Sequence, residues 1–183
     1  MSNRMMIWVA AALLAGINGC GLSPDPNLPP LEVADQVDVA RYMGRWYEIA
    51  KYPVFFEQGC FGVTADYELQ DDGTVRVLNT CRGADGGVAS TIEGFAEVAD
   101  AATNAKLTVY FFFPFGAPYW ILEVGENYQY AVVGDPSRTF LWILSRTPTM
   151  NQQTFDDIVS RLPARAYDPE GLELTPQDSG TSP

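Results

Sequence analysis

The stretch from residue 45 to residue 146 consists of short segments in which apolar and polar residues alternate, separated by Gly, Pro, Asp or Asn. Such alternation places one face of a strand against a core and the other in water. Evenly spaced short strands are typical of a sandwich or a barrel, and large apolar residues on only one face favour a single sheet closed on itself. We therefore predict an all-β fold, an eight-stranded up-and-down antiparallel barrel. The expected strands cover residues 45–52, 63–70, 74–81, 89–98, 105–113, 118–124, 128–134 and 139–146.

One helix is expected after these strands. Asn151 stands where an N-cap residue is favoured. Four apolar residues then recur at the spacing of one helix face: Phe155, Ile158, Val159 and Leu162. The C-terminal α-helix should pack against the outside of the barrel, so that residues 37–165 form the folded domain.

The composition narrows the classes of function. With 47% apolar and 13% aromatic residues, the chain of 183 residues can bury a core. A net charge of −12 with only 11 Lys and Arg argues against nucleic-acid binding, because phosphate recognition needs clustered cations. The chain has no His, which is the usual general base of hydrolases and a common metal ligand. We expect no enzyme activity, no metal and no cofactor.

The N-terminal residues have the features of an export signal. Arg4 precedes an apolar run from Met5 to Ala15 that is too short to span a bilayer. The sequence INGC at residues 17–20 resembles the lipobox of bacterial lipoproteins, in which the chain is cut before an acylated cysteine. We expect residues 1–19 to be a signal peptide and Cys20 to be the lipid anchor. An ordinary signal peptide with a chance cysteine is the alternative.

Two further stretches flank the predicted domain. Residues 20–36 contain four prolines and are expected to form a stiff tether. Gly21 after the cysteine points, by analogy with lipoproteins, to the outer membrane, at its periplasmic face. Residues 166–183 are expected to be a C-terminal tail.

Successive loops of an up-and-down barrel alternate between its two ends. The loops at 71–73, 99–104 and 125–127 share one end and are short or polar. The loops at the other end contain several aromatic residues: Phe55, Phe56, Phe61 and Phe115. We interpret these as a hydrophobic lid over a ligand, with a membrane contact or a homodimer interface as alternatives.

The polar end is expected to be the closed base. Trp46 near the start of the first strand and Arg146 at the end of the last both fall there. The first and last strands of a closed barrel are neighbours, so Arg146 can lie over the indole ring, a contact worth about 1–2 kcal/mol. Gly44 would let the chain turn in beneath the tryptophan.

Three stretches resemble one protein family. They are VDVARYMGRWYEIAKYPVFFEQGC from residue 37, APYWIL at 117–122 and GDPSRTFLWILSRTP from residue 134. Gly44 with Trp46, the GDP at 134–136 and Arg146 match the lipocalin motifs in order and spacing. The chain resembles the bacterial outer-membrane lipocalins, which are related to apolipoprotein D. This resemblance implies a small hydrophobic ligand inside the barrel, a fatty acid or a lysophospholipid.

The interior of a small barrel holds either packed side chains or a ligand. Ala65 and Ala96 leave room for a ligand, although simple core packing is the alternative for any single inward residue. No Lys or Arg is predicted on the inner face near the apolar end, so the charge of the ligand stays open. Strand parity predicts these inward residues: Val63, Ala65, Tyr67, Leu69, Val75, Val77, Asn79, Leu107, Val109, Phe111, Phe113, Trp142 and Leu144.

Some of the polar and aromatic residues are candidate ligand contacts. Tyr67, Phe111 and Trp142 are the strongest, because the resemblance matches them to aromatic pocket positions of the apolipoprotein-like proteins. The weaker candidates carry hydroxyl or amide groups that can hydrogen-bond a polar head: Tyr42, Asn79, Tyr119 and Tyr130.

Two cysteines remain once Cys20 is acylated. Cys60 precedes the second strand and Cys81 ends the third, at the same end of one hairpin. In a regular hairpin Cys60 and Cys81 would miss lying directly opposite each other by two or three residues. A bulge near Gly62 would bring them together. In an oxidising compartment we predict a disulfide between them, worth about 3 kcal/mol. A reactive thiol is the alternative.

The sequence is compatible with three functions. The first is binding of a small hydrophobic ligand at the outer membrane, for storage, scavenging or transport. The second is an enzyme that isomerises or hydrolyses such a ligand, and the third is a ligand-free envelope scaffold. The missing His and the expected disulfide favour binding over catalysis.

Overall fold

The computed structural model describes residues 27–177, so the predicted signal peptide, Cys20 and residues 178–183 lie outside it. Its sheet contains the eight antiparallel strands expected from the sequence and one short further strand. Their bounds are β1 Gly44–Lys51, β2 Val63–Leu69, β3 Val75–Arg82, β4 Val88–Val98, β5 Lys106–Phe112, β6 Phe115–Val124, β7 Tyr130–Gly134, β8 Leu141–Ser145 and β9 Glu173–Leu174.

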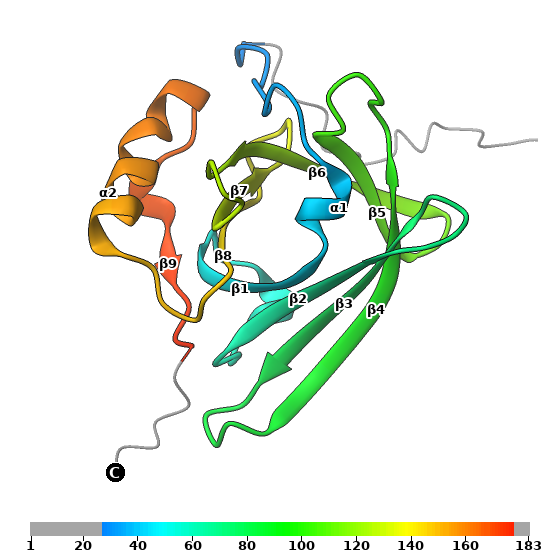
Figure 1. The fold of residues 1–183 in the computed structure, drawn as a ribbon. Helices are drawn as coiled ribbons and strands as arrows, with labels where there is room; N and C mark the ends of the chain where they lie inside the picture. The colour runs from blue at the N-terminus through cyan, green and yellow to red at the C-terminus, as the bar shows by residue number, and fades with distance from the viewer. Residues whose placement is uncertain (1–26, 178–183) are drawn as a thin grey trace, which may run out of the picture.

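The first eight strands form a closed ring, seen end-on in Figure 1. Each strand pairs antiparallel with the next, and β8 returns to pair with β1, where Tyr47 lies opposite Ser145. On its other side β1 pairs with β2 from Gly44, opposite Tyr67, to Tyr47, opposite Thr64. The predicted up-and-down barrel is confirmed. We call the end formed by the loops after β1, β3, β5 and β7 the open end, and the opposite end the base.

A short helix that the sequence analysis did not predict covers the base. This helix, α1 (Val39–Tyr42), begins at Asp38, whose side chain accepts a hydrogen bond from the Arg41 backbone. Tyr42 is 3% exposed and packs against the ring of Trp46, with 5.0 Å between the ring centroids. The α1 helix therefore forms the base of the barrel together with the first residues of β1.

Trp46 and Arg146 meet at this base. The indole of Trp46 is fully buried, and the guanidinium carbon of Arg146 lies 3.7 Å from the centroid of its ring. Arg146 also donates hydrogen bonds to the backbone carbonyl oxygens of Arg45, at 2.9 Å, and of Arg41, at 2.7 Å. Gly44 has φ of +91°, a backbone conformation that favours glycine. One cation thus joins the end of β8 to β1 and α1.

An irregularity in β1 changes which way its side chains face. The register with β8 shifts between Glu48 and Ala50. Trp46 belongs to the inner cluster of the barrel, whereas Ala50 belongs to the outer cluster beneath the C-terminal helix. Glu48 lines the interior, so it is the last residue of β1 that faces inward before the shift.

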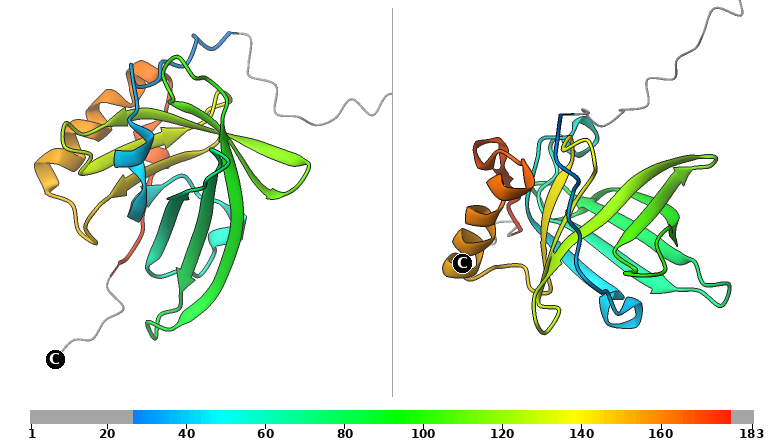
Figure 2. Two further views of the ribbon diagram at one scale, coloured as in Figure 1. Left: turned by 45° about the vertical axis from the view of Figure 1, so that its right-hand side comes forward. Right: turned by 90° about the horizontal axis from the view of Figure 1, so that it is seen from above.

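The C-terminal helix α2 (Gln152–Arg161) packs on the outside of the barrel, as predicted and as Figure 2 shows. Asn151 caps it by accepting hydrogen bonds from the backbones of Gln153 and Thr154. Ile158 and Leu162 are buried against the outer faces of β7 and β8. Val132 and Ile143 of these strands belong to the same outer hydrophobic cluster. Within residues 27–177, no helix has the length and apolar character needed to span a membrane.

Much of the expected tail is part of the fold. After α2 come two 3₁₀ turns, η2 (Pro163–Arg165) and η3 (Pro169–Gly171), and then β9, which pairs with β1 at Ala50 and Lys51. The side-chain amide of Gln177 donates hydrogen bonds to the carbonyl oxygens of Glu48 and Val63. Residues 173–177 therefore fill the gap where β1 and β2 separate near the open end. The segment shows no periodicity in its sequence, because its contacts with the barrel are made by backbone groups and by two polar side chains, those of Thr175 and Gln177.

The disulfide between Cys60 and Cys81 is confirmed, with 5.3 Å between the two Cα atoms. Val63, not Cys60, lies opposite Cys81 in the β2–β3 ladder. Gly62 has φ of +77°, and the Phe61 backbone donates a hydrogen bond to the carbonyl of Arg82 at 2.6 Å. The chain therefore bends at Gly62, which brings Cys60 back toward the end of β3.

Replacing Arg146 with Lys tests the closure of the base. Lysine keeps the charge but lacks the planar group that stacks on the indole and reaches two carbonyl oxygens at once. We expect R146K to lower the free energy of unfolding by about 1–3 kcal/mol. Urea denaturation followed by tryptophan fluorescence measures it.

The matched control is R76K. Arg76 lies on the outer face of β3 and pairs with the exposed carboxylate of Glu93. Such surface pairs contribute little to stability. Equal denaturation midpoints for R146K and R76K would contradict the role given to Arg146.

Candidate functional site

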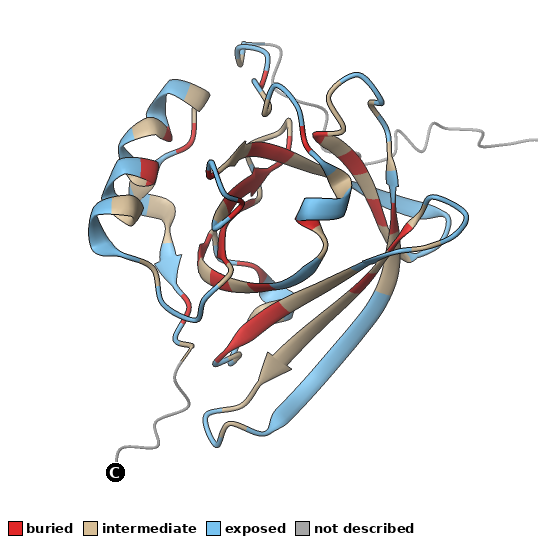
Figure 3. Ribbon diagram, viewed as in Figure 1, coloured by how far each residue is buried: buried red, intermediate tan, exposed pale blue. Residues whose placement is uncertain are grey.

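The barrel encloses a cavity of about 250 Å³. Three alanines, Ala65, Ala96 and Ala117, lie on its wall and leave space that larger side chains would fill. Figure 3 shows the buried residues concentrated around the ring, while the part of β4 nearest the open end is exposed. The rest of the wall is mostly apolar and aromatic: Met43, Phe56, Val63, Val75, Val77, Leu107, Val109, Phe111, Pro118, Phe140, Trp142 and Leu144.

The structure brings six of the seven candidate contacts to this one cavity. They come from α1 and from five different strands, so only the closed barrel places them together. The six residues are Tyr42, Tyr67, Asn79, Phe111, Tyr119 and Trp142.

Tyr130 is the candidate contact that does not lie on the cavity. Its hydroxyl donates a hydrogen bond to Glu123 at 2.6 Å, and its ring packs in the outer cluster beneath α2. On β7 the inward residues are Ala131 and Val133. Because successive residues of a strand face opposite sides, Tyr130 faces outward and is removed from the candidate contacts.

Two other residues expected inside the barrel are exposed. Phe113 is 77% exposed, because the register with β6 shifts between Tyr110 and Phe112 and β5 ends at Phe112. Leu69 is the last residue of β2 and is 47% exposed at the end of the barrel. Alternation along a strand correctly predicts which side of the sheet a residue in its middle faces. It fails at the ends of a strand and at register shifts.

Three tyrosine hydroxyl groups form a chain inside the cavity. The hydroxyl of Tyr119 lies 2.8 Å from that of Tyr42 and 3.0 Å from that of Tyr67. Burial raises the pKa of Tyr67 to about 12 and holds the pKa values of Tyr42 and Tyr119 well above their ordinary range. The three hydroxyls therefore stay uncharged at neutral pH and bond to one another.

Asn79 presents an acceptor without a partner. Its side-chain oxygen Oδ1 is buried and, within the described structure, has no hydrogen-bond partner. Buried polar atoms of folded proteins nearly always have one, so this atom is suited to a hydrogen-bond donor from outside the chain. Asn79 lies two residues before Cys81, which places it toward the open end of β3.

Glu48 is a polar cavity residue that the sequence analysis missed. It is 3% exposed, and its carboxylate accepts a hydrogen bond from the hydroxyl of Thr175. The ammonium of Lys51 lies 3.3 Å from Glu48 and 2.6 Å from Glu57, which also lines the cavity. Alternation from the inward Trp46 was the signal that could have identified Glu48.

Burial and the negative charge of Glu57 raise the pKa of Glu48 to about 7. Its carboxylate therefore changes charge near neutral pH, on the wall of an otherwise apolar cavity. The charges that surround it are those of Lys51 on its own strand and Glu57 in the 3₁₀ turn η1 (Phe55–Glu57).

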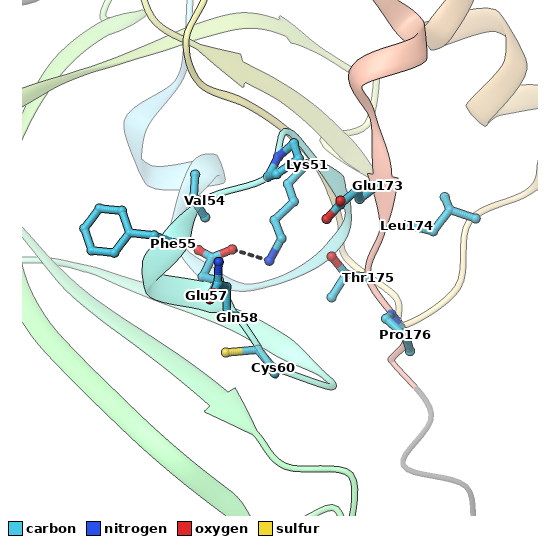
Figure 4. Close-up of a pocket in the computed structure, with 12 residues that line it drawn as sticks. Lys51, Val54, Phe55, Glu57, Gln58, Cys60, Glu173, Leu174, Thr175 and Pro176 are labelled. Carbon is cyan, nitrogen blue, oxygen red and sulfur yellow. Dashed lines mark hydrogen bonds and ion pairs between the residues drawn. The ribbon is translucent and has the colours of Figure 1, made fainter.

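A second pocket, of about 410 Å³, lies between η1 and the C-terminal segment, with the Lys51–Glu57 ion pair at its centre in Figure 4. Its other lining residues are a mixture of polar side chains, such as Gln58, Glu173 and Thr175, and apolar ones, such as Val54 and Leu174. The barrel cavity is the better candidate site for an apolar molecule because most of its wall is apolar or aromatic. Among residues 27–177, no group of three or more His, Cys, Asp and Glu residues is placed to hold a metal ion.

An aromatic rim, formed by exposed phenylalanines, lies at two of the loops of the open end. Phe55, Phe112, Phe113 and Phe115 form it, and each is at least 73% exposed. Phe56, expected with Phe55 to form a lid, lines the cavity and is 56% exposed. Of the four phenylalanines proposed as a lid, Phe56 lines the cavity, whereas Phe55, Phe61 and Phe115 are not among its lining residues.

The charge of Glu48 should affect stability. The folded-state pKa of about 7 exceeds the ordinary value of 4.5, so Glu48 binds its proton more tightly in the folded protein. The stability contributed by this protonation is fully present below about pH 4.5 and is lost as the pH rises through about 7. We expect the free energy of unfolding of the wild type to fall, relative to that of E48Q, between about pH 5 and about pH 8. Urea denaturation across this range measures the difference.

The control for this experiment is E68Q, because the side chain of Glu68 is 67% exposed on the outer face of β2. It changes the net charge by the same amount without touching the cavity. If the wild type, E48Q and E68Q give parallel curves of stability against pH, Glu48 does not titrate in this range.

Several known proteins are similar to this chain in sequence or in fold. Over 165 residues the chain is 38% identical to outer membrane lipoprotein Blc of Escherichia coli strain K12, covering 90% of this chain and 93% of that protein. It is 33% identical to apolipoprotein D of Macaca fascicularis over 188 residues, covering 96% and 97%. The solved structure of insecticyanin from the tobacco hornworm Manduca sexta shares the fold, with a TM-score of 0.65, 22% identity and coverage of 84% and 87%.

The family model of the lipocalin-like domain matches residues 37–177. This range includes all the strands of the barrel, helix α2 and β9. It also extends past the expected end of the domain at residue 165 to the segment that closes the gap between β1 and β2. The protein belongs to the lipocalin family.

Proposed function

We propose that the protein binds one single-chain lipid, a fatty acid, a lysophospholipid or a similar lipid, inside its barrel. The observation that carries this proposal is the cavity of about 250 Å³ with an apolar wall. That volume lies just below the usual range of ligand pockets, about 300–1,000 Å³, which favours one alkyl chain over a larger molecule. Each methylene group that enters contributes about 0.8 kcal/mol.

Binding rather than catalysis is the role that the chain supports. The only cysteines within residues 27–177, Cys60 and Cys81, are joined in a disulfide, so neither is available as a nucleophile. The chain has no His to act as a general base. The tyrosine hydroxyls of the cavity keep their protons, because burial raises their pKa values. A lipid held here would be stored, scavenged or carried without chemical change.

The site of action that we propose is the outer membrane, at its periplasmic face. The lipobox-like sequence before Cys20 supports a lipid anchor, and the Escherichia coli relative is by name an outer membrane lipoprotein. Two or more acyl chains on one cysteine hold a protein on a membrane, whereas one chain binds reversibly. An anchored barrel would exchange its ligand with the bilayer next to it.

Removing cavity aromatics tests the binding site. We expect W142A and Y67A to weaken binding of lysophosphatidylcholine at least about tenfold, which corresponds to about 1.4 kcal/mol, because each removes a large apolar contact. Native mass spectrometry and quenching of tryptophan fluorescence measure binding to delipidated protein.

The matched control is Y110A. Tyr110 stacks on Phe95, with 4.9 Å between ring centroids, and does not line the cavity. Wild-type protein that binds no lipid would contradict the proposed function. Equal losses in Y110A and the cavity variants would contradict the proposed site.

Replacing Cys20 tests the anchor. We expect C20A, expressed in a bacterium that processes lipoproteins, to lose incorporation of labelled palmitate and to leave the membrane fraction. C60A combined with C81A is the control, because it removes the other two cysteines and should keep the label. Unchanged labelling of C20A would show that another group is acylated.

A further inference from the structure

We propose that the cavity selects, among the single-chain lipids of the proposed function, those whose head group donates hydrogen bonds and carries no net negative charge. Glu48, Glu57 and Asn79 would contact that head. A monoacylglycerol is the simplest lipid of this class. The inference depends on the proposed function, because it concerns which lipid the same cavity accepts.

The charges on the cavity wall are the first reason. Two carboxylates, those of Glu48 and Glu57, are among the lining residues, whereas none of the lining residues in the described part of the chain is Lys or Arg. The nearest cation, Lys51, lies outside the cavity lining and is already bonded to Glu57 at 2.6 Å. Two carboxylates and one ammonium leave this group with a negative charge when all three are ionised.

The arginine at the base cannot supply the missing positive charge. The guanidinium of Arg146 is stacked on Trp46 and donates to two carbonyl oxygens of β1 and α1. It does not line the cavity. The carboxylate of a fatty acid would thus lie near like charges, with no cation available to pair with it.

The hydrogen-bonding capacity of the wall is the second reason. Ionised carboxylates only accept hydrogen bonds, and the Oδ1 atom of Asn79 is an acceptor that lacks a partner. The hydroxyls of Tyr42, Tyr67 and Tyr119 are bonded to one another. Apart from one tyrosine O–H and the amide N–H groups of Asn79, the polar groups left for a ligand are the acceptors of Glu48, Glu57 and Asn79, which match hydroxyl groups better than a further carboxylate.

The positions of these acceptors place the head at the open end. Glu57 belongs to η1 in the loop after β1, three residues before Cys60. Asn79 is two residues before Cys81, the partner of Cys60 in the disulfide. Both therefore lie toward the end where the cavity opens. The alkyl chain would extend from there toward Trp46 and the tyrosines at the base.

A comparison of two lipids with the same alkyl chain tests the proposal. The probes are palmitate and 1-monopalmitoylglycerol, each displacing the uncharged fluorophore N-phenyl-1-naphthylamine from delipidated protein at about pH 8, where Glu48 is ionised. We expect wild-type protein to bind the monoacylglycerol at least about tenfold more tightly than palmitate. We expect E48Q to reduce that ratio to about threefold or less, through tighter palmitate binding.

Two further variants separate charge from hydrogen bonding. N79L should weaken monoacylglycerol binding at least about threefold and palmitate binding by less, because the glycerol hydroxyl groups lose the acceptor Oδ1, which an ionised carboxylate cannot use. E57Q should change the ratio in the same direction as E48Q, so the charge argument can be tested even if E48Q folds poorly. Circular dichroism and thermal unfolding check the fold of each variant.

The matched control is E68Q, which makes the same charge change on the outer face of β2 and should leave the ratio at its wild-type value. Equal or tighter binding of palmitate by the wild type would overturn the proposal. An equal change of the ratio in E68Q and in the cavity variants would overturn it as well. If neither lipid displaces the fluorophore, the proposed function itself fails, which is a different outcome.

Discussion

The closed base of the barrel is the constraint on which the rest of the structure depends. One guanidinium, that of Arg146, stacks on the buried indole of Trp46 and ties the end of β8 to β1 and α1. A ring of strands needs its first and last members in register, and this contact is made where those two strands meet. With the base filled by large aromatic side chains, the remaining interior can stay open without exposing the whole core to water.

The two halves of the wall differ in how they are supported. β7 and β8 are covered on the inside by the barrel's own cluster and on the outside by α2, through Ile158 and Leu162. Within residues 27–177 no such outer layer covers β3 and β4, and the first six residues of β4 are exposed. A strand covered on both faces has more buried contacts to lose on opening, so the β7–β8 side is the more stable half. The cavity lies between a supported wall and an exposed one.

Glu48 shows how a polar group can be placed in an apolar cavity. The shift in β1 makes it the last inward residue of that strand, and the C-terminal segment bonds to both its side chain and its backbone. The ammonium of Lys51 then balances part of its charge. A buried carboxylate without such partners would be strongly destabilising. The segment after β9 is therefore part of the site's framework, although it lies outside the ring of eight strands.

The sequence by itself determined the local features. Alternation defined all eight strands, the i, i+3, i+4 spacing defined α2, and parity from Trp46 and Arg146 oriented the strand interiors. Only the tertiary structure decided that Tyr130 faces α2, that Phe113 leaves the barrel, and that residues 173–177 join the sheet. The reason is physical: periodicity reports which side of a strand is apolar. Strand ends, register shifts and backbone pairing depend on neighbours that are distant in the chain.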